Sequence, residues 1–334
     1  MTLEPHDLKN PGAREAPLLQ WKRGLPGIVA VVVGCAGFFT LLALHDRGSV
    51  EPRAASLSAS PSPALTSAIF GNQLPFERSV VRMIEEQGYI TVTVHVALAD
   101  RSFSSVAPRF GDGDDPTRNL CWGALYGVET HLANAGGWRR AHTDDGDGAE
   151  IIRRVVFHRP AEPTEAWLSR GVTASFDVYV LANAWPSSAI VAAMEQPLRD
   201  AMTDAETVLT VDGNDIAFGA ASAVVGYFGY NRMLDEYWDP FAGLTPGEHP
   251  FQAGVFYLCS RSAVVLHQPV VDRGLYSVLF VREPVVPEAY LLDGMLKAIV
   301  RGELADGVLT GAAEEYARFQ TDVSPGRARE MLYR

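Results

Sequence analysis

The sequence predicts an α/β domain of three layers, built on a mainly parallel sheet of about six strands. From about residue 70 onward, short apolar runs rich in β-branched residues alternate with longer stretches in which apolar residues follow helical spacing. That alternation is typical of parallel strands joined by crossover helices. The chain has 334 residues and is 47% hydrophobic, which is enough to bury a large core. We find no segment that repeats at a fixed period, which argues against solenoids and propellers.

In the first half of the domain, the pattern predicts three strands and two helices. The strands are residues 89–100, 153–159 and 174–185, which are short runs of β-branched and aromatic residues. One helix is expected over residues 122–136, which end at glycine, and another over residues 186–202, which begin with proline.

The second half of the domain continues the alternation. Three further strands are expected over residues 224–229, 255–258 and 274–282, and two closing helices over residues 287–302 and 306–320. Because parallel strands end at the same edge of a sheet, a ligand site is expected where these strands have their carboxyl ends.

A segment near the N-terminus is apolar enough to cross a membrane. Residues 25–44 carry no charge, and about 20 helical residues span the roughly 30 Å hydrocarbon core of a bilayer. Lys22 and Arg23 directly precede the segment, so the positive-inside rule places the N-terminus in the cytoplasm and the rest of the chain in the periplasm or outside the cell. The alternatives are a cleaved signal peptide, a lipidated Cys35 and a buried core helix.

These features divide the chain into four parts. We expect a cytoplasmic tail over residues 1–24, a transmembrane anchor over residues 25–45, and a flexible linker rich in Ser, Pro and Ala over residues 46–69. The α/β domain then occupies residues 70–334.

Composition excludes several classes of function. The chain has 40 acidic and 28 basic residues, a formal charge of −12, and no basic cluster that would neutralise nucleic-acid phosphates. Its three cysteines are too few for a disulfide scaffold and too irregularly spaced for a zinc site. The acidic stretches 110–119 and 143–150 do not match a calcium loop, and Gly111 and Gly113 lack the third glycine of a dinucleotide fingerprint. No cofactor, metal or nucleic acid is therefore expected.

Polar residues follow the predicted strands at the edge where a ligand site is expected. The candidate binding residues are Asp100, Trp185, Asn231, Ser260 and Glu288, and the candidate reactive pair is Tyr230 and Cys259.

The pair resembles the active site of a known class of enzymes. In caspase-like cysteine peptidases (clan CD), one strand of a roughly six-stranded α/β sheet ends in Gly-His, and the neighbouring strand ends in the nucleophilic Cys. Here "VVGYFGYN" places Gly229-Tyr230 at the Gly-His position, and "VFYLCS" places Cys259 at the nucleophile. The domain is also similar to a family of uncharacterised bacterial proteins that carry Gly-His-Asn where this chain has Gly-Tyr-Asn.

The tyrosine predicts loss of peptidase activity. A cysteine nucleophile needs a neighbouring base or cation, and a phenol of pKa about 10 is neutral at pH 7. His95, His249 and His267 are the alternative bases. Cys259 also has two other interpretations: a buried structural thiol, and a disulfide with Cys121 in an oxidising compartment.

Three hypotheses of function follow. The first is a membrane-anchored, catalytically inactive caspase-like domain that binds a peptide or protein partner. The second is an active cysteine hydrolase with Cys259 as nucleophile and an unrecognised base. The third is a doubly wound enzyme that acts on a small molecule, because fold alone does not fix function.

Overall fold

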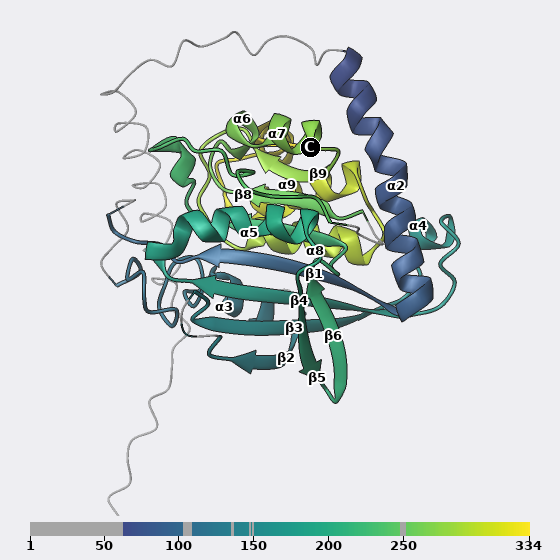
Figure 1. Cartoon of the computed structure of the whole chain (residues 1–334), viewed down its shortest axis with the longest axis horizontal. Coiled ribbons are helices and arrows are strands. Elements are labelled where there is room, and N and C mark those ends of the chain that lie inside the picture. The colour runs from purple at the N-terminus through teal and green to yellow at the C-terminus, as the bar shows by residue number, and fades with distance from the viewer. Residues whose placement is uncertain (1–62, 103–108, 135–136, 147, 149, 248–251) are drawn as a thin grey trace, which may run out of the picture. The chain divides into compact units, whose positions relative to one another are not determined.

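The structure, a computed structural model, describes residues 63–102, 109–134, 137–146, 148, 150–247 and 252–334. These residues form an α/β domain with one large mixed sheet, most of it parallel, and a separate hairpin (Figure 1). The predicted tail, the predicted anchor at residues 25–45 and residues 46–62 of the predicted linker lie outside them. Across the part of the chain that is described, no helix is long and apolar enough to cross a bilayer.

The main sheet has eight strands in the order β10-β9-β8-β7-β1-β4-β3-β2. In chain order the strands are β1 (Tyr89–Ala97), β2 (Arg139–Asp144), β3 (Arg153–Ala161), β4 (Phe176–Trp185), β7 (Val224–Phe228), β8 (Gly254–Leu258), β9 (Tyr276–Val281) and β10 (Leu332–Tyr333). Strands β4, β1, β7, β8 and β9 are parallel, whereas β3, β2 and β10 extend the two sides antiparallel. The prediction of a mainly parallel sheet is confirmed, but the sheet has eight strands where about six were expected, because the mostly exposed β2 and the two-residue β10 contain no apolar run.

The helices lie between and after these strands. They are α2 (Pro63–Gln87), α3 (Val128–Asn134), α4 (Glu165–Leu168), α5 (Ile190–Met202), α6 (Ser262–Val265), α7 (His267–Asp272), α8 (Tyr290–Val300), α9 (Asp306–Phe319) and α10 (Pro325–Met331), with 3-10 turns η1 (Ser187–Ala189) and η2 (Arg232–Leu234). Helix α2 begins within residues 46–69, the stretch expected as a linker.

Both faces of the central strands are buried, and for this reason the sequence of each strand is a continuous apolar run. Side chains alternate between two cores: Val224 and Phe228 pack on one face, and Val225 and Tyr227 pack on the other. The first core is closed by α2, α3, α8 and α9, and the second by α5, α6 and α7. The sheet therefore lies between two helical layers.

A hairpin takes the place of a helix over β3 and β4. Its strands are β5 (Glu206–Val211) and β6 (Asn214–Gly219), and Figure 1 shows it in front of the sheet, below α5. Phe218 of the hairpin packs with Tyr179 and Leu181 of β4. Asp212 and Gly213 both have positive φ, 51° and 86°, as a two-residue hairpin turn requires. The sequence interpretation did not include this hairpin.

The helix expected over residues 122–136 is present only from Val128 to Asn134 among the described residues, so the predicted start was wrong. Turns occupy residues 120–127, and the helix begins only at Val128. The Asn119 side chain accepts hydrogen bonds from the backbone N–H of Ala99 and of Cys121, and it donates to the carbonyl of Ala99. These contacts hold the loop against the end of β1, and this tertiary anchor outweighs local helical spacing.

Candidate functional site

Strands β7 and β8 lie side by side, as the sequence predicted. Phe228 pairs with Leu258 in a parallel register, so the next residues, Gly229 and Cys259, leave the sheet at the same edge. Gly229 has φ 150°, and a Cβ there would lie 3.1 Å from the carbonyl oxygen of Ala97 on β1. The ends of β1, β7 and β8 therefore meet closely at one edge of the sheet, called the carboxyl edge below.

Cys259 is enclosed at the carboxyl edge. Its exposed fraction is 1%, and it packs in the core beneath α5, α6 and α7. Burial raises the pKa of the thiol well above its ordinary value, although a hydrogen bond with the Ser262 side chain acts in the opposite direction. The thiol is therefore protonated at neutral pH and shielded from solvent.

Tyr230 packs against the same core as Cys259, but its hydroxyl has another partner. The phenol donates a hydrogen bond of 3.0 Å to Asp235 Oδ1. Partial burial, and then the charge of Asp235, raise the pKa of Tyr230 to about 12. A neutral phenol directed at a carboxylate cannot take a proton from a thiol at neutral pH.

The histidines considered as alternative bases have other partners. His95 is buried, its Nδ1 accepts from the Trp185 indole at 3.1 Å, and its Nε2 donates to Asp200 Oδ2 at 2.8 Å. His267 is buried against Phe280 and Tyr333. Burial, and then Arg282, lower the pKa of His267 to about 4. His249 lies outside the described residues.

Asn231 and Ser260 fasten the connections at the carboxyl edge. The fully buried Asn231 donates from Nδ2 to the Ser260 carbonyl at 2.8 Å, and its Oδ1 accepts from the Met233 N–H. The Ser260 hydroxyl donates to the Val285 carbonyl and accepts from the Val285 N–H. Both residues bond to protein backbone and tie the ends of β7, β8 and β9 together.

Asp100 and Trp185 have similar local roles. Asp100 accepts from the Ser102 backbone and hydroxyl, and these bonds lower the pKa of the carboxyl. Its second oxygen accepts from Ser187, which follows β4, at 3.3 Å. The indole of Trp185 is 2% exposed and donates to His95.

Glu288 lies in the connection that leads into α8, next to Ala289 and Tyr290, which pack in the core on the opposite face of the sheet from Cys259. The Glu288 carboxyl is buried, and burial raises its pKa despite a hydrogen bond with Tyr290. Cys121, in the same core as Tyr290, is a free buried thiol whose pKa burial raises to about 12. Cys121 and Cys259 pack in different cores and are both free, so the structure does not contain the disulfide considered above.

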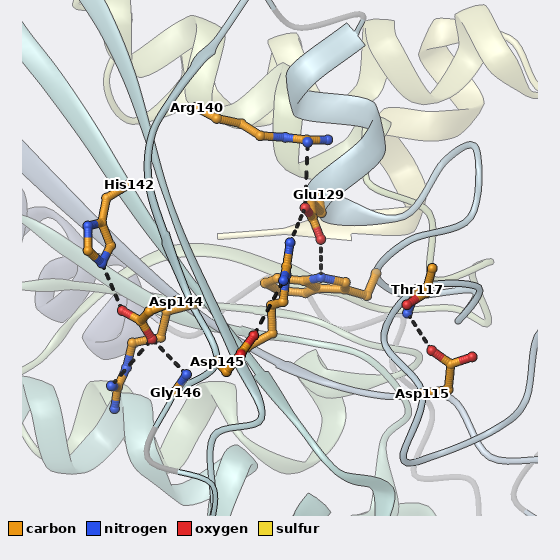
Figure 2. A network of polar contacts seen from close by, with 11 residues as sticks. Asp115, Thr117, Glu129, Arg140, His142, Asp144, Asp145 and Gly146 are labelled. Carbon is orange, nitrogen blue, oxygen red and sulfur yellow. Dashed lines mark hydrogen bonds and ion pairs between the residues drawn. The ribbon is translucent and has the colours of Figure 1, made fainter.

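A polar network that the sequence did not reveal lies beside the end of β4, where β2 ends and β3 begins (Figure 2). Its centre is Glu129 of α3, which accepts from the Trp122 indole at 2.6 Å. The guanidinium groups of Arg153 and Arg140 lie 3.3 and 3.7 Å from the same carboxylate, and Arg153 also pairs with Asp145. Two strands and a helix are thereby fastened around one largely buried charge.

The second part of this network holds residues 142–146 of the chain, which include the start of the acidic stretch. His142 Nε2 lies 2.8 Å from Asp144 Oδ2, and Asp144 Oδ1 accepts from the Gly146 N–H (Figure 2). In the other acidic stretch, Asp115 accepts from the Thr117 N–H. These carboxylates organise turns, and within the described ranges no group of three His, Cys, Asp or Glu residues is placed to hold a metal ion.

Several exposed large apolar side chains lie on the connections that follow the parallel strands. Within the described residues these are Leu125 after β1, Val191 after β4, Leu234 and Tyr237 after β7, and Val264 after β8. Three others, Leu74, Leu168 and Val208, lie on α2, α4 and β5. Five of the eight exposed large apolar side chains among the described residues therefore lie on connections that leave the carboxyl edge.

Comparison of the chain with protein-family models, with curated proteins and with solved structures gives no match.

Proposed function

We propose that this chain is a membrane-anchored, caspase-like domain without peptidase activity, which binds a peptide or protein partner at the carboxyl edge of its sheet. The observation that carries the proposal is the state of Cys259, a protonated thiol with an exposed fraction of 1%. Thiolate is the form that attacks a carbonyl, so a thiol in this environment is a poor nucleophile. The neighbouring positions of Gly229-Tyr230 and Cys259 on β7 and β8 support the caspase-like part of the proposal.

The binding role rests on what the carboxyl edge presents to solvent. Its predicted polar residues are bonded to other groups of the domain, whereas Leu234, Tyr237 and Val264 project from it with exposed fractions of 42%, 69% and 61%. Apolar groups gathered on one surface are typical of a protein interaction site.

A thiol probe and peptide substrates test the proposal together. Under reducing conditions, we expect that iodoacetamide does not label Cys259 stoichiometrically in the native full-length chain. We also expect no peptide hydrolysis that depends on Cys259, as judged by comparison with Cys259→Ala. Labelling should become stoichiometric in urea, because unfolding exposes the thiol. Fast native labelling together with Cys259-dependent turnover would refute the proposal and favour the active hydrolase. A nucleotide that copurifies with the chain would instead favour the small-molecule enzyme.

The membrane anchor is tested separately. Because residues 25–45 are expected to span the bilayer, the full-length chain should fractionate with membranes and resist extraction by high salt and carbonate. Protease added outside spheroplasts should digest the domain. Protection of the domain there would contradict the proposed topology.

A further inference from the structure

We infer that the partner docks on segment 232–239, between β7 and β8, and that it does so through a basic stretch that carries a large apolar side chain. This inference rests on the proposed binding function and names the chemistry of the partner. Segment 232–239 reads "RMLDEYWD" and contains three acidic residues and one basic residue.

The first support is the way in which the segment is held. Met233 is 5% exposed and packs in the core of Cys259, and the Asn231 side chain caps the turn at its start. The hydroxyl of Tyr230 bonds to Asp235. These contacts fix the backbone before any partner arrives, so binding costs little ordering of the segment.

The second support is the direction of its apolar side chains. Leu234 ends the 3-10 turn η2, the bond from the Glu236 N–H to the Arg232 carbonyl closes the following bend, and Tyr237 comes directly after that bend. Both side chains are exposed and only three residues apart in sequence, so one partner segment can contact both. Tyrosine is among the residues that contribute most to binding at protein interfaces.

The third support is charge. Arg232 is neutralised within the segment, because its guanidinium lies 2.8 Å from Asp235 and 3.9 Å from Glu236. Glu236 has an exposed side-chain fraction of 79%, and Asp239 is also exposed. The segment therefore keeps a net negative charge beside its apolar side chains, on a chain of charge −12, and complements a cationic partner.

Peptide binding to the full-length chain in detergent tests the inference. Three fluorescein-labelled sets of equal length are compared by fluorescence anisotropy: basic peptides with Leu, Phe or Trp, acidic peptides with the same apolar residues, and basic peptides in which Ser replaces them. We expect the first set to bind about tenfold more tightly than the other two. Binding should weaken between about 0.01 and 1 M salt, as the Debye length falls from roughly 30 to 3 Å.

Variants locate the site. Glu236→Lys should weaken binding of the first set about two- to tenfold, and Tyr237→Ser about tenfold or more. Glu206→Lys and Val208→Ser are matched controls, because both residues are exposed on β5, and they should leave binding unchanged. Circular dichroism verifies that each variant remains folded.

The results that overturn the inference are specific. Equal binding of acidic peptides, or no binding of any set, refutes the cationic partner. Binding that the segment variants leave unchanged refutes the location. Failure of the proposed function gives a different result, namely cleavage of these peptides into fragments detected by mass spectrometry and abolished by Cys259→Ala.

Discussion

Replacing Asp200 by alanine should strongly destabilise the domain, because this carboxylate is the acceptor for two side chains in the interior. Its Oδ2 lies 2.8 Å from His95 Nε2, its Oδ1 accepts from Gln196 at 2.8 Å, and the side chains of His95 and Asp200 are each 4% exposed. The Trp185 indole donates to the other ring nitrogen of His95, so the ring must present its proton to Asp200. Asp200→Ala leaves that proton without an acceptor.

The expected loss is about 3 kcal/mol in the free energy of unfolding. A hydrogen bond to a charged acceptor contributes about 1.5–3 kcal/mol, and an unpaired buried donor costs about 1–3 kcal/mol. The two values describe partly the same effect and are not summed, so we expect a total loss of about 3 kcal/mol. That loss is a large part of the roughly 5–15 kcal/mol by which domains are stable.

Urea unfolding, followed by tryptophan fluorescence and circular dichroism, measures this loss. Asp322→Ala, at an exposed position, is the matched control and should change stability by less than about 0.5 kcal/mol. In a double-mutant cycle, His95→Ala with Asp200→Ala should cost at least about 1 kcal/mol less than the sum of the single losses. A loss below about 1 kcal/mol for Asp200→Ala, or strict additivity, would refute the coupling inferred from the geometry.

Three further predictions follow from buried polar groups. Glu129→Gln removes the charge that faces Arg153 and Arg140, and should lower stability by about 1–2 kcal/mol in urea unfolding, whereas Glu162→Gln, at an exposed position, should not. Ser262→Ala removes the acceptor of the Val281 N–H and the donor to the Tyr257 carbonyl. It should lower stability by about 1–3 kcal/mol and speed iodoacetamide labelling of Cys259. Unchanged labelling would show that Ser262 does not shield the thiol. Burial lowers the pKa of His267 from 6.5 to about 4, so the unfolded chain binds more protons than the folded chain between pH 4 and 6.5. The free energy of unfolding should therefore fall by about 3 kcal/mol as the pH drops from 6.5 to 4. His267→Leu should remove that part of the pH dependence of the urea midpoint.

The central strands were predictable because their burial requires a recognisable run of apolar residues in the sequence. Strands β1, β7 and β8 are buried on both faces, which requires the continuous apolar runs that identified them. The hairpin β5–β6 also left a signal, since Asp212-Gly213 between alternating apolar residues is a strong hairpin pattern. The start of the helix expected over residues 122–136 was not predictable for a different reason. The contact of Asn119 with Ala99 holds the preceding loop, and the local spacing of apolar residues carries no information about that contact.

The candidate site divides in the same way. Adjacency of Tyr230 and Cys259 followed from strand order, which connection rules restrict to a few choices. The partners of these side chains did not follow, because they come from residues that carry no motif. Asp235 receives the Tyr230 phenol, and Ser262, at the start of α6, bonds to the Cys259 thiol. The pair His95 and Asp200 is separated by 105 positions in sequence, so no spacing rule points to it.

Among the described residues of the carboxyl edge, we expect a ligand to be recognised by groups that the structure itself does not use. The side chains of Asn119, Asn231 and Ser260 are each bonded to the backbone of a neighbouring strand end, so rotating one toward a ligand would break the connection that it holds. These polar side chains are therefore committed to the connections that they hold. Leu234 and Tyr237 project outward and can be buried by a partner without disturbing any of these bonds. A partner can contact these exposed side chains while the hydrogen bonds beneath them stay intact, which suits this surface to binding. For this reason we propose that the function lies on the outer surface of the carboxyl edge and not at the Cys259 thiol beneath it.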